Sequence, residues 1–150
     1  MAALEAMFAD YASYHQTQGN KWCHRIGIPL IMFSLLGMLE RVTLFAAAGI
    51  RLDAALALIA LVTVYYFALD WRFGALMLGI SLAMWALGRP VPMAAHIALF
   101  VSGWVLQFLG HGVWEKRQPA FMRNLVHLLI GPLWILDDAV GLSARRREVA

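Results

Sequence analysis

Five histidines are spread along this chain, and four of them can meet at one level of a helical bundle. The five are His15, His24, His96, His111 and His127. Imidazole nitrogen binds iron, zinc and copper well, so a convergent set of histidines indicates a metal site. His96 precedes His111 by fifteen positions, which corresponds to about 22 Å along one helix. We therefore expect His96 at the opposite end of the bundle from the other four.

Polar side chains accompany two of these histidines at helical spacing. Gln107, His111 and Glu115 recur at every fourth position. Asn20 likewise precedes His24 by four positions. Residues four apart lie on one helix face, so each stripe can direct nitrogen and oxygen atoms toward a shared centre. The alternative is a set of interfacial histidines that only satisfy polar contacts, and spacing alone leaves both interpretations open.

Other catalytic chemistries find little support in the sequence. Serines are few, and none lies beside a histidine or an acid in a nucleophile motif. The sequence contains no glycine-rich phosphate-binding loop. The single cysteine, Cys23, excludes an internal disulfide, and we interpret it as a buried, inert residue.

The composition predicts that these side chains belong to an integral membrane protein. Apolar residues make up 62% and charged residues 14% of the 150 residues, against about 45–50% and about 25% in ordinary soluble domains. A soluble domain of this size buries too small a fraction of its surface to hide that much apolar area. The net charge of +3 does not indicate a nucleic-acid partner, because the basic residues sit singly between apolar runs, apart from 145–147.

Apolar runs separated by charged or turn-forming residues define the expected elements. The runs cover 26–39, 54–69, 73–88, 91–114 and 125–136. Only the fourth clearly reaches the ~20 residues of a membrane span. The first three are long enough if their flanking Trp, Tyr and Arg residues serve as interfacial anchors. We predict an all-α, polytopic membrane bundle with about four spanning helices, an N-terminal amphipathic helix and a C-terminal re-entrant or fifth helix.

The chain is expected to form one membrane-embedded domain, residues 1–150. Its parts are an amphipathic leader at 2–25 with His15 and His24, a helical bundle at 26–140 and a basic tail at 141–150. Keeping the basic residues on one side of the membrane favours a re-entrant fifth run over a fifth crossing. A bacterial inner membrane and the endoplasmic reticulum fit such a chain equally well.

Two local expectations concern helix boundaries. Residues 2–17 have the periodicity of an amphipathic helix, which Gly19 ends, and Asn20 caps the helix that follows. The apolar segment 42–50 either extends the first run or forms a surface helix.

Two sequence blocks resemble a known family. The first, at 14–29, reads YH-x4-N-x3-H-x2-GIP, and the second, at 103–120, reads GW-x2-QF-x-GHGVWEKR-x-PA. These blocks, and the order and hydropathy of the chain from Tyr11 to about Asp138, resemble the 2-hydroxy fatty acid dioxygenase family, which acts in phytosphingosine breakdown by fatty acid α-oxidation.

The resemblance implies an iron(II)-dependent enzyme of the membrane that uses O2 to shorten a 2-hydroxy fatty acid by one carbon. The expected metal ligands are His15, His24 and His111, and His127 or Glu115 is expected to complete the set. His127 stands where the family is expected to have a glutamine. The expected catalytic residues are His15, His24, His111 and Glu115. The residues expected to orient the ligands are Asn20, Gln107 and Asp138.

The implied substrate is itself a lipid, so it partitions into the bilayer and presents its carboxylate at the headgroup level. We expect the apolar runs to bound a groove for its tail. The candidates for binding the carboxylate are Lys21, Arg25, Lys116 and Arg117. An equally good account of these four cations is that they extend to the membrane interface.

Two other functions remain open at this point. A b-type haem electron carrier would use the histidines as axial ligands. A non-catalytic lipid-binding membrane protein would use them only for polar contacts.

Overall fold

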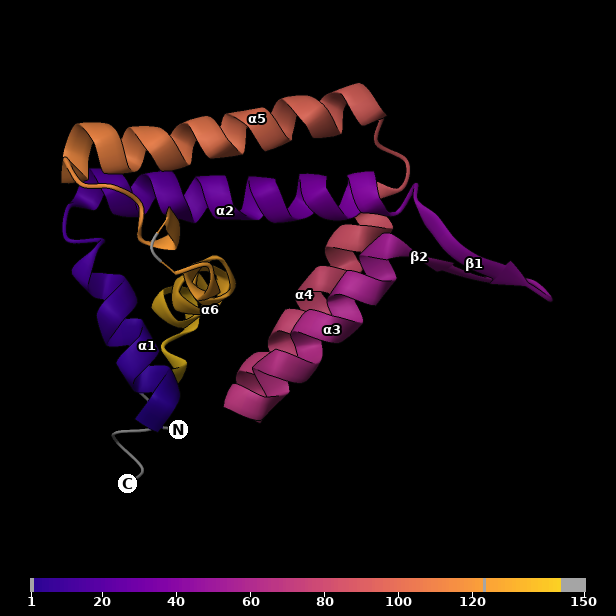
Figure 1. Ribbon diagram of the computed structural model, residues 1–150, viewed down its shortest axis with the longest axis horizontal. Helices are drawn as coiled ribbons and strands as arrows, with labels where there is room; N and C mark the ends of the chain where they lie inside the picture. Colours follow the sequence, from indigo (N-terminus) through magenta and orange to yellow (C-terminus); the bar gives the residue numbers. More distant parts are fainter. Residues whose placement is uncertain (1, 123, 144–150) are drawn as a thin grey trace.

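The computed structural model describes residues 2–122 and 124–143, and the regular structure of these residues is helical apart from one β-hairpin (Figure 1). The six α-helices are α1 Ala2–Ser13, α2 Gln18–Leu39, α3 Ala54–Leu69, α4 Trp71–Gly88, α5 Met93–Leu109 and α6 Val126–Val140. The shorter elements are the strands β1 Thr43–Ala47 and β2 Ile50–Asp53, the π-helix η1 Gly110–Glu115 and the 3-10 helix η2 Ala120–Met122. The predicted helical fold class is therefore confirmed, with the hairpin as an addition.

Helices α2 and α5 lie side by side along their length and run in opposite directions (Figure 1). Gly27 and Gly103 allow this approach: a Cβ atom on Gly103 would lie 2.9 Å from the Gly27 carbonyl oxygen. Small residues commonly let membrane helices pack this closely. The antiparallel pairing brings the start of α2, with His24, next to the end of α5, where η1 carries His111.

The same pairing carries His96 to the other end of the bundle. His96 is buried near the start of α5, where its ring packs against Gly37 close to the end of α2. Its Nε2 atom lies 3.0 Å from the carbonyl oxygen of Gly88. The structure thus separates His96 from the other four histidines, in agreement with its position in the sequence.

Helices α3 and α4 form a tight hairpin that leaves the far end of α2 at an angle (Figure 1). Asp53 caps α3 by accepting a hydrogen bond from the Leu56 amide at 2.9 Å. Asp70 is the single residue between the two helices and caps α4 through the Arg72 amide. These two caps satisfy amide groups that a helix start otherwise leaves without partners.

The expectation that segment 42–50 is helical is wrong. This segment contributes most of a β-hairpin, β1–β2, that projects from the bundle (Figure 1). Ala48 and Gly49 both have positive φ, 50° and 79°, as a two-residue hairpin turn requires. The conformation of the turn, together with the strand-favouring Thr and Phe residues before it, overrides the apolar pattern.

The first helix boundary also differs from the prediction. Helix α1 ends at Ser13, and α2 begins at Gln18 with Thr17 as its N-cap residue. Asn20 therefore lies inside the first turn of α2 and is not its N-cap residue. The link at 14–17, which carries His15, is held by contacts with η1 that are described below.

Helices α1 and α6 pack together below the start of α2 (Figure 1). Their shared core extends to the α3–α4 hairpin and consists of Leu4, Phe8, Tyr11, Tyr66, Phe73, Met77, Ile130 and Leu133. Burial of this aromatic and aliphatic cluster fixes α1 against α6, which positions Tyr11 and His127 on facing helices.

Among the described residues, three helical segments are long and apolar enough to cross a membrane: 18–39, 71–88 and 93–115. Helix α3 is apolar but has 16 residues. Helix α6 has 15 residues and continues through Pro132, so this proline does not break it. The count of about four spans stays a prediction, and most of the predicted basic tail at 141–150 lies outside the described residues.

Candidate metal centre

Three buried histidines from three separate segments come together at one end of the α2–α5 pair. One nitrogen each of His15, His24 and His111 lies within 4.8 Å of the others. His15 comes from the link after α1, His24 from α2 and His111 from η1. Their ring centroids are 4.3 to 4.9 Å apart. Among the residues that the structure describes, this is the histidine-rich group suited to a metal ion.

Two of these rings are oriented by backbone carbonyl groups. Nδ1 of His15 lies 2.6 Å from the Tyr11 carbonyl oxygen, and Nδ1 of His24 lies 3.0 Å from the Asn20 carbonyl oxygen. A carbonyl oxygen only accepts hydrogen bonds, so each Nδ1 carries a proton and donates it. In the neutral imidazole the other nitrogen, Nε2, then presents a lone pair.

The two Nε2 atoms face each other at 3.0 Å. Burial lowers the pKa of His15 from 6.5 to about 4, so this ring is neutral at pH 7. Two lone pairs in such contact repel each other unless a cation lies between them. Imidazole nitrogen binds a first-row metal at about 2.0–2.1 Å, so two ligands of one ion lie roughly 3 Å apart. The histidine pair therefore fits a bound metal ion.

A cavity of about 20 Å³ lies among these rings. Its wall is formed by Tyr11, His15, His24, Gln107, His111, Phe121 and His127. A water molecule needs about 10–15 Å³ measured in this way, so the cavity has room for one small species. Within residues 2–122 and 124–143, Nδ1 of His111, Nδ1 of His127 and Nε2 of Gln107 are buried without a hydrogen-bond partner.

This geometry does not suit a b-type haem. Axial ligands bind on opposite faces of the haem plane, each at about 2 Å from the iron, so their nitrogens lie about 4 Å apart with the macrocycle between them. The Nε2 atoms of His15 and His24 are closer than that, and the cavity is far smaller than a haem.

His127 lines the same cavity from α6 and is held by an acid from α1. Its Nε2 atom lies 2.8 Å from Oδ2 of Asp10. A carboxylate on one ring nitrogen is the usual device that orients a metal-binding histidine through the other nitrogen. His127 nevertheless lies outside the group of three whose nitrogens are all within 4.8 Å.

Glu115 does not face the cavity but fastens the link that carries His15. Its Oε1 accepts a hydrogen bond from the Gln16 amide at 2.8 Å. Its Oε2 accepts from the Thr17 amide at 3.1 Å, the Thr17 hydroxyl at 2.8 Å and the Asn20 side-chain amide at 3.1 Å. With four donors, Glu115 has little capacity left for a metal and instead joins η1 to the start of α2.

The π-helix itself is part of this arrangement. Residues 110–115 form the wider π turns, and the left-handed Lys116, with φ of 52°, ends them. Such segments insert an extra residue into a helix and are frequent at functional sites. Here η1 turns His111 toward the cavity and Glu115 toward the link at 14–17.

The other residues predicted for the site are divided between the cavity and the surface. Gln107 lines the cavity. Asp138 lies away from it and pairs with Arg25, with Nη2 and Oδ2 2.6 Å apart. Because Arg25 already forms an ion pair with Asp138, it is less available to bind a substrate carboxylate than the other predicted cations.

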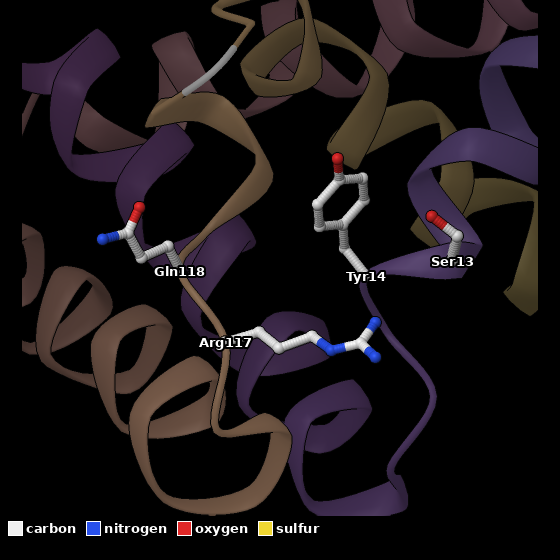
Figure 2. A pocket seen from close by; sticks show the side chains of 4 residues that line it. All are labelled: Ser13, Tyr14, Arg117 and Gln118. Atoms are coloured by element: carbon white, nitrogen blue, oxygen red, sulfur yellow. The ribbon is translucent and has the colours of Figure 1, made fainter.

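Arg117 is the predicted cation best situated near the histidines. It lines an open pocket of about 480 Å³ together with His111 and Lys116. It also lines a second pocket of about 450 Å³ with Ser13, Tyr14 and Gln118. Figure 2 shows its side chain extending from the loop after η1 toward the segment that carries Tyr14.

Three contributors to the site, Tyr11, Asp10 and Phe121, were not among the predicted residues. Tyr11 lines the cavity and stacks on His15, with ring centroids 4.0 Å apart. Asp10 holds His127 across 117 positions of sequence. Tyr11 belongs to the apolar stripe of the first helix, which is a signal for burial but not for a site. No sequence signal connects Asp10 to its partner.

Comparison with known proteins agrees with the resemblance seen in the sequence. A family model described as 2-hydroxy-palmitic acid dioxygenase Mpo1-like matches residues 1–142. The 2-hydroxy-palmitic acid dioxygenase MPO1 of Saccharomyces cerevisiae is 31% identical over 136 residues, covering 90% of this chain and 78% of the yeast protein. No solved structure is significantly similar to the chain. The predicted family relationship is thereby confirmed.

Proposed function

Because the chain belongs to the family of Mpo1-like 2-hydroxy-palmitic acid dioxygenases, we propose that it is an iron(II)-dependent dioxygenase that shortens 2-hydroxy fatty acids by one carbon. The observation that carries the metal dependence is the pair of unprotonated Nε2 atoms, 3.0 Å apart, on His15 and His24. A cation bound between them would turn this repulsive contact of two buried lone pairs into two coordinate bonds.

The ligand set consists of His15, His24 and His111, with His127 as a fourth nitrogen donor. His127 suits this role better than Glu115 because its Nδ1 is buried without a partner, whereas both oxygens of Glu115 already accept hydrogen bonds. Bound iron supplies the redox chemistry with O2 that carbon–carbon cleavage requires. Imidazole ligands in this number fill only part of the coordination sphere of a first-row metal.

Protein side chains bind and orient the polar end of the substrate. Gln107 lines the cavity and its amide nitrogen is buried without a hydrogen-bond partner among the described residues, so this side chain is the candidate donor to an oxygen atom of the 2-hydroxy acid. The Arg117 guanidinium lies in the pockets beside His111 and Tyr14 and attracts the carboxylate. An arginine fork binds a carboxylate through two parallel hydrogen bonds.

The depth of the centre suits a substrate that is itself a membrane lipid. His24 and His111 lie at neighbouring ends of two helices that are long enough to span a membrane. A fatty acid in a bilayer keeps its carboxylate at the headgroup level and its tail in the apolar layer. The carboxylate and the 2-hydroxyl carbon of the substrate therefore lie at the same depth in the membrane as the converging histidines.

The test is to purify the protein in detergent, measure iron by elemental analysis and supply 2-hydroxypalmitate with O2. We expect iron in the protein and a fatty acid product one carbon shorter. His111→Ala should abolish both, whereas His96→Ala, at the other end of the bundle, should keep the metal. An iron-loaded protein that leaves 2-hydroxypalmitate intact, or full turnover in His111→Ala, would refute the proposal.

A further inference from the structure

An apolar pocket of about 270 Å³ lies in the middle of the helical bundle, between α2, α3, α4, α5 and α6. Its volume approaches the ~300 Å³ at which ligand pockets in proteins begin. No charged side chain of the described residues lines it. The lining side chains with polar atoms are Ser81, Tyr66 and Trp104, and the Tyr66 hydroxyl already donates to the Leu129 carbonyl oxygen at 2.7 Å. Such a wall offers few partners to water and suits a hydrocarbon chain.

This pocket adjoins the metal centre through a pair of aromatic rings. Trp104 lines the apolar pocket, and Phe121 lines the histidine cavity. The two rings meet edge to face, with centroids 5.3 Å apart. On α6, His127 of the cavity is followed directly by Leu128 of the pocket. The two spaces are therefore neighbours, and the Trp104–Phe121 ring pair lies between them.

The pocket also extends in the direction that a fatty acid tail would take. Along α2 its wall begins at Ile31 and reaches Leu36. These positions are seven and twelve residues beyond His24, which corresponds to about 10 and 18 Å along the helix axis. The pocket thus lies on the membrane-core side of the metal centre, with its far end deep among the apolar helices.

We propose that this pocket holds the alkyl chain of the 2-hydroxy acid, and that its depth sets the chain length that the enzyme accepts. The inference rests on the proposed function, because it takes the substrate to be a fatty acid whose polar end lies at the histidines. The tail passes the Trp104–Phe121 ring pair and ends between α2, α3 and α4. Apolar side chains there replace the lipid that surrounds the tail in the bilayer.

Ser81→Phe tests this inference, because Ser81 is half-buried in the α4 wall and a larger side chain there shortens the pocket. Rates are measured on a series from 2-hydroxyoctanoate to 2-hydroxypalmitate. The variant should lose at least about tenfold on 2-hydroxypalmitate relative to 2-hydroxyoctanoate, since single methylene groups in an apolar pocket discriminate by roughly 10–200-fold. Ser102→Phe is the matched control, because Ser102 is exposed on α5 and lines no part of the pocket.

Leu35→Ala is the complementary variant. Leu35 is half-buried at the deep end of the pocket, and truncating it should raise the rate on acids longer than 2-hydroxypalmitate relative to wild type. This variant removes atoms instead of adding them, so it keeps the inference testable if Ser81→Phe does not fold.

Several outcomes would overturn the inference. Equal chain-length profiles in Ser81→Phe, Leu35→Ala and Ser102→Phe would mean that the tail lies elsewhere. If Ser81→Phe loses a membrane lipid that copurifies with wild type, and its chain-length profile is unchanged, then the pocket holds a structural lipid and not the substrate tail. If wild type acts on no 2-hydroxy acid of any length, the proposed function itself fails, which this design distinguishes from failure of the pocket.

Discussion

Nε2 of His15 and Nε2 of His24 lie 3.0 Å apart, while each ring donates a hydrogen bond from Nδ1 to a backbone carbonyl group of the residue four positions earlier. The i to i−4 contacts fix both rings, so neither can turn away to relieve the repulsion between the lone pairs. A bound metal ion would remove this repulsion and replace it with two coordinate bonds. We therefore expect the stability of the protein to be coupled to metal binding.

Removing the metal should lower the thermal stability of the protein. A ligand present at a hundred times its Kd stabilises the folded state by about 2.7 kcal/mol, which for a chain of this length corresponds to roughly 5–10 °C in Tm. We expect a strong chelator to lower Tm in detergent by that amount, and anaerobic Fe(II) or Co(II) to restore it. Tm should not respond to metal in His24→Ala, and an identical response there would contradict the ligand assignment.

Glu115→Gln should weaken metal binding without removing a ligand. A neutral amide accepts fewer hydrogen bonds than the carboxylate and brings an NH2 group toward the donors of Gln16 and Thr17. Loosening of the link that carries His15 should raise the metal Kd about 10–100-fold. Activity should recover when metal is in excess.

The matched control for this prediction is Glu5→Gln, because Glu5 is exposed on α1. Titration with Co(II), followed in the visible spectrum, measures Kd for each variant. A Glu115→Gln protein whose saturated Co(II) spectrum differs from that of wild type would show that Glu115 is itself a ligand.

His127→Gln should lower metal affinity and alter the Co(II) spectrum. The substitution removes the Nδ1 atom of a ring that lines the cavity, and this atom is buried without a hydrogen-bond partner among the described residues. Asp10→Asn should have a smaller effect in the same direction, about tenfold in Kd, because it only disturbs the orientation of the ring. If the Co(II) spectra of both variants at metal saturation match that of wild type, the ligands are limited to the three histidines His15, His24 and His111.

Acid should destabilise the metal-free protein through His15. Its pKa is lowered from 6.5 to about 4 by burial, so between these values the unfolded chain binds a proton that the folded chain does not. The contribution of His15 to stability is therefore fully present above about pH 6.5 and is lost as the pH falls to about 4.

This pH dependence is measured as the Tm of wild type and of His15→Gln, both with chelator, over that range. The other titrating groups are common to both proteins, so the difference between the two curves reports on His15 and on its coupling to the neighbouring His24. Parallel curves would mean that His15 titrates normally in the folded protein.

Gly103→Ala should destabilise the α2–α5 pair. Its Cβ atom would lie 2.7 Å from Cγ1 of Ile31 and 2.9 Å from the Gly27 carbonyl oxygen. Overpacking of this kind costs about 1–3 kcal/mol. Gly79→Ala is the control, because nothing lies within 4 Å of its added Cβ atom. Equal unfolding midpoints in detergent for the two variants would contradict the close packing of these helices.

The sequence by itself predicted the helical fold class and the separation of the histidines. The apolar run at 54–69 coincides with α3, because an aspartate bounds the run on each side. Asp53 caps α3 itself, and Asp70 caps the next helix, α4. His96 could be set apart from His111 because their distance along one helix depends only on the rise per residue. The motifs at 14–29 and 103–120 indicated the family. A motif match depends on residue identity, so it did not require any knowledge of packing.

Only the tertiary structure decided which partner each polar side chain has. Glu115 lies on the same sequence stripe as His111, yet the π-helical turns send it to the link at 14–17. Asp138 was expected to orient a ligand but pairs with Arg25, and Asp10 holds His127. These pairs join residues about a hundred positions apart, so they depend on how helices rotate and pack against one another. Hydrophobic periodicity determines which face of a helix is buried, but it does not determine which neighbour that face meets.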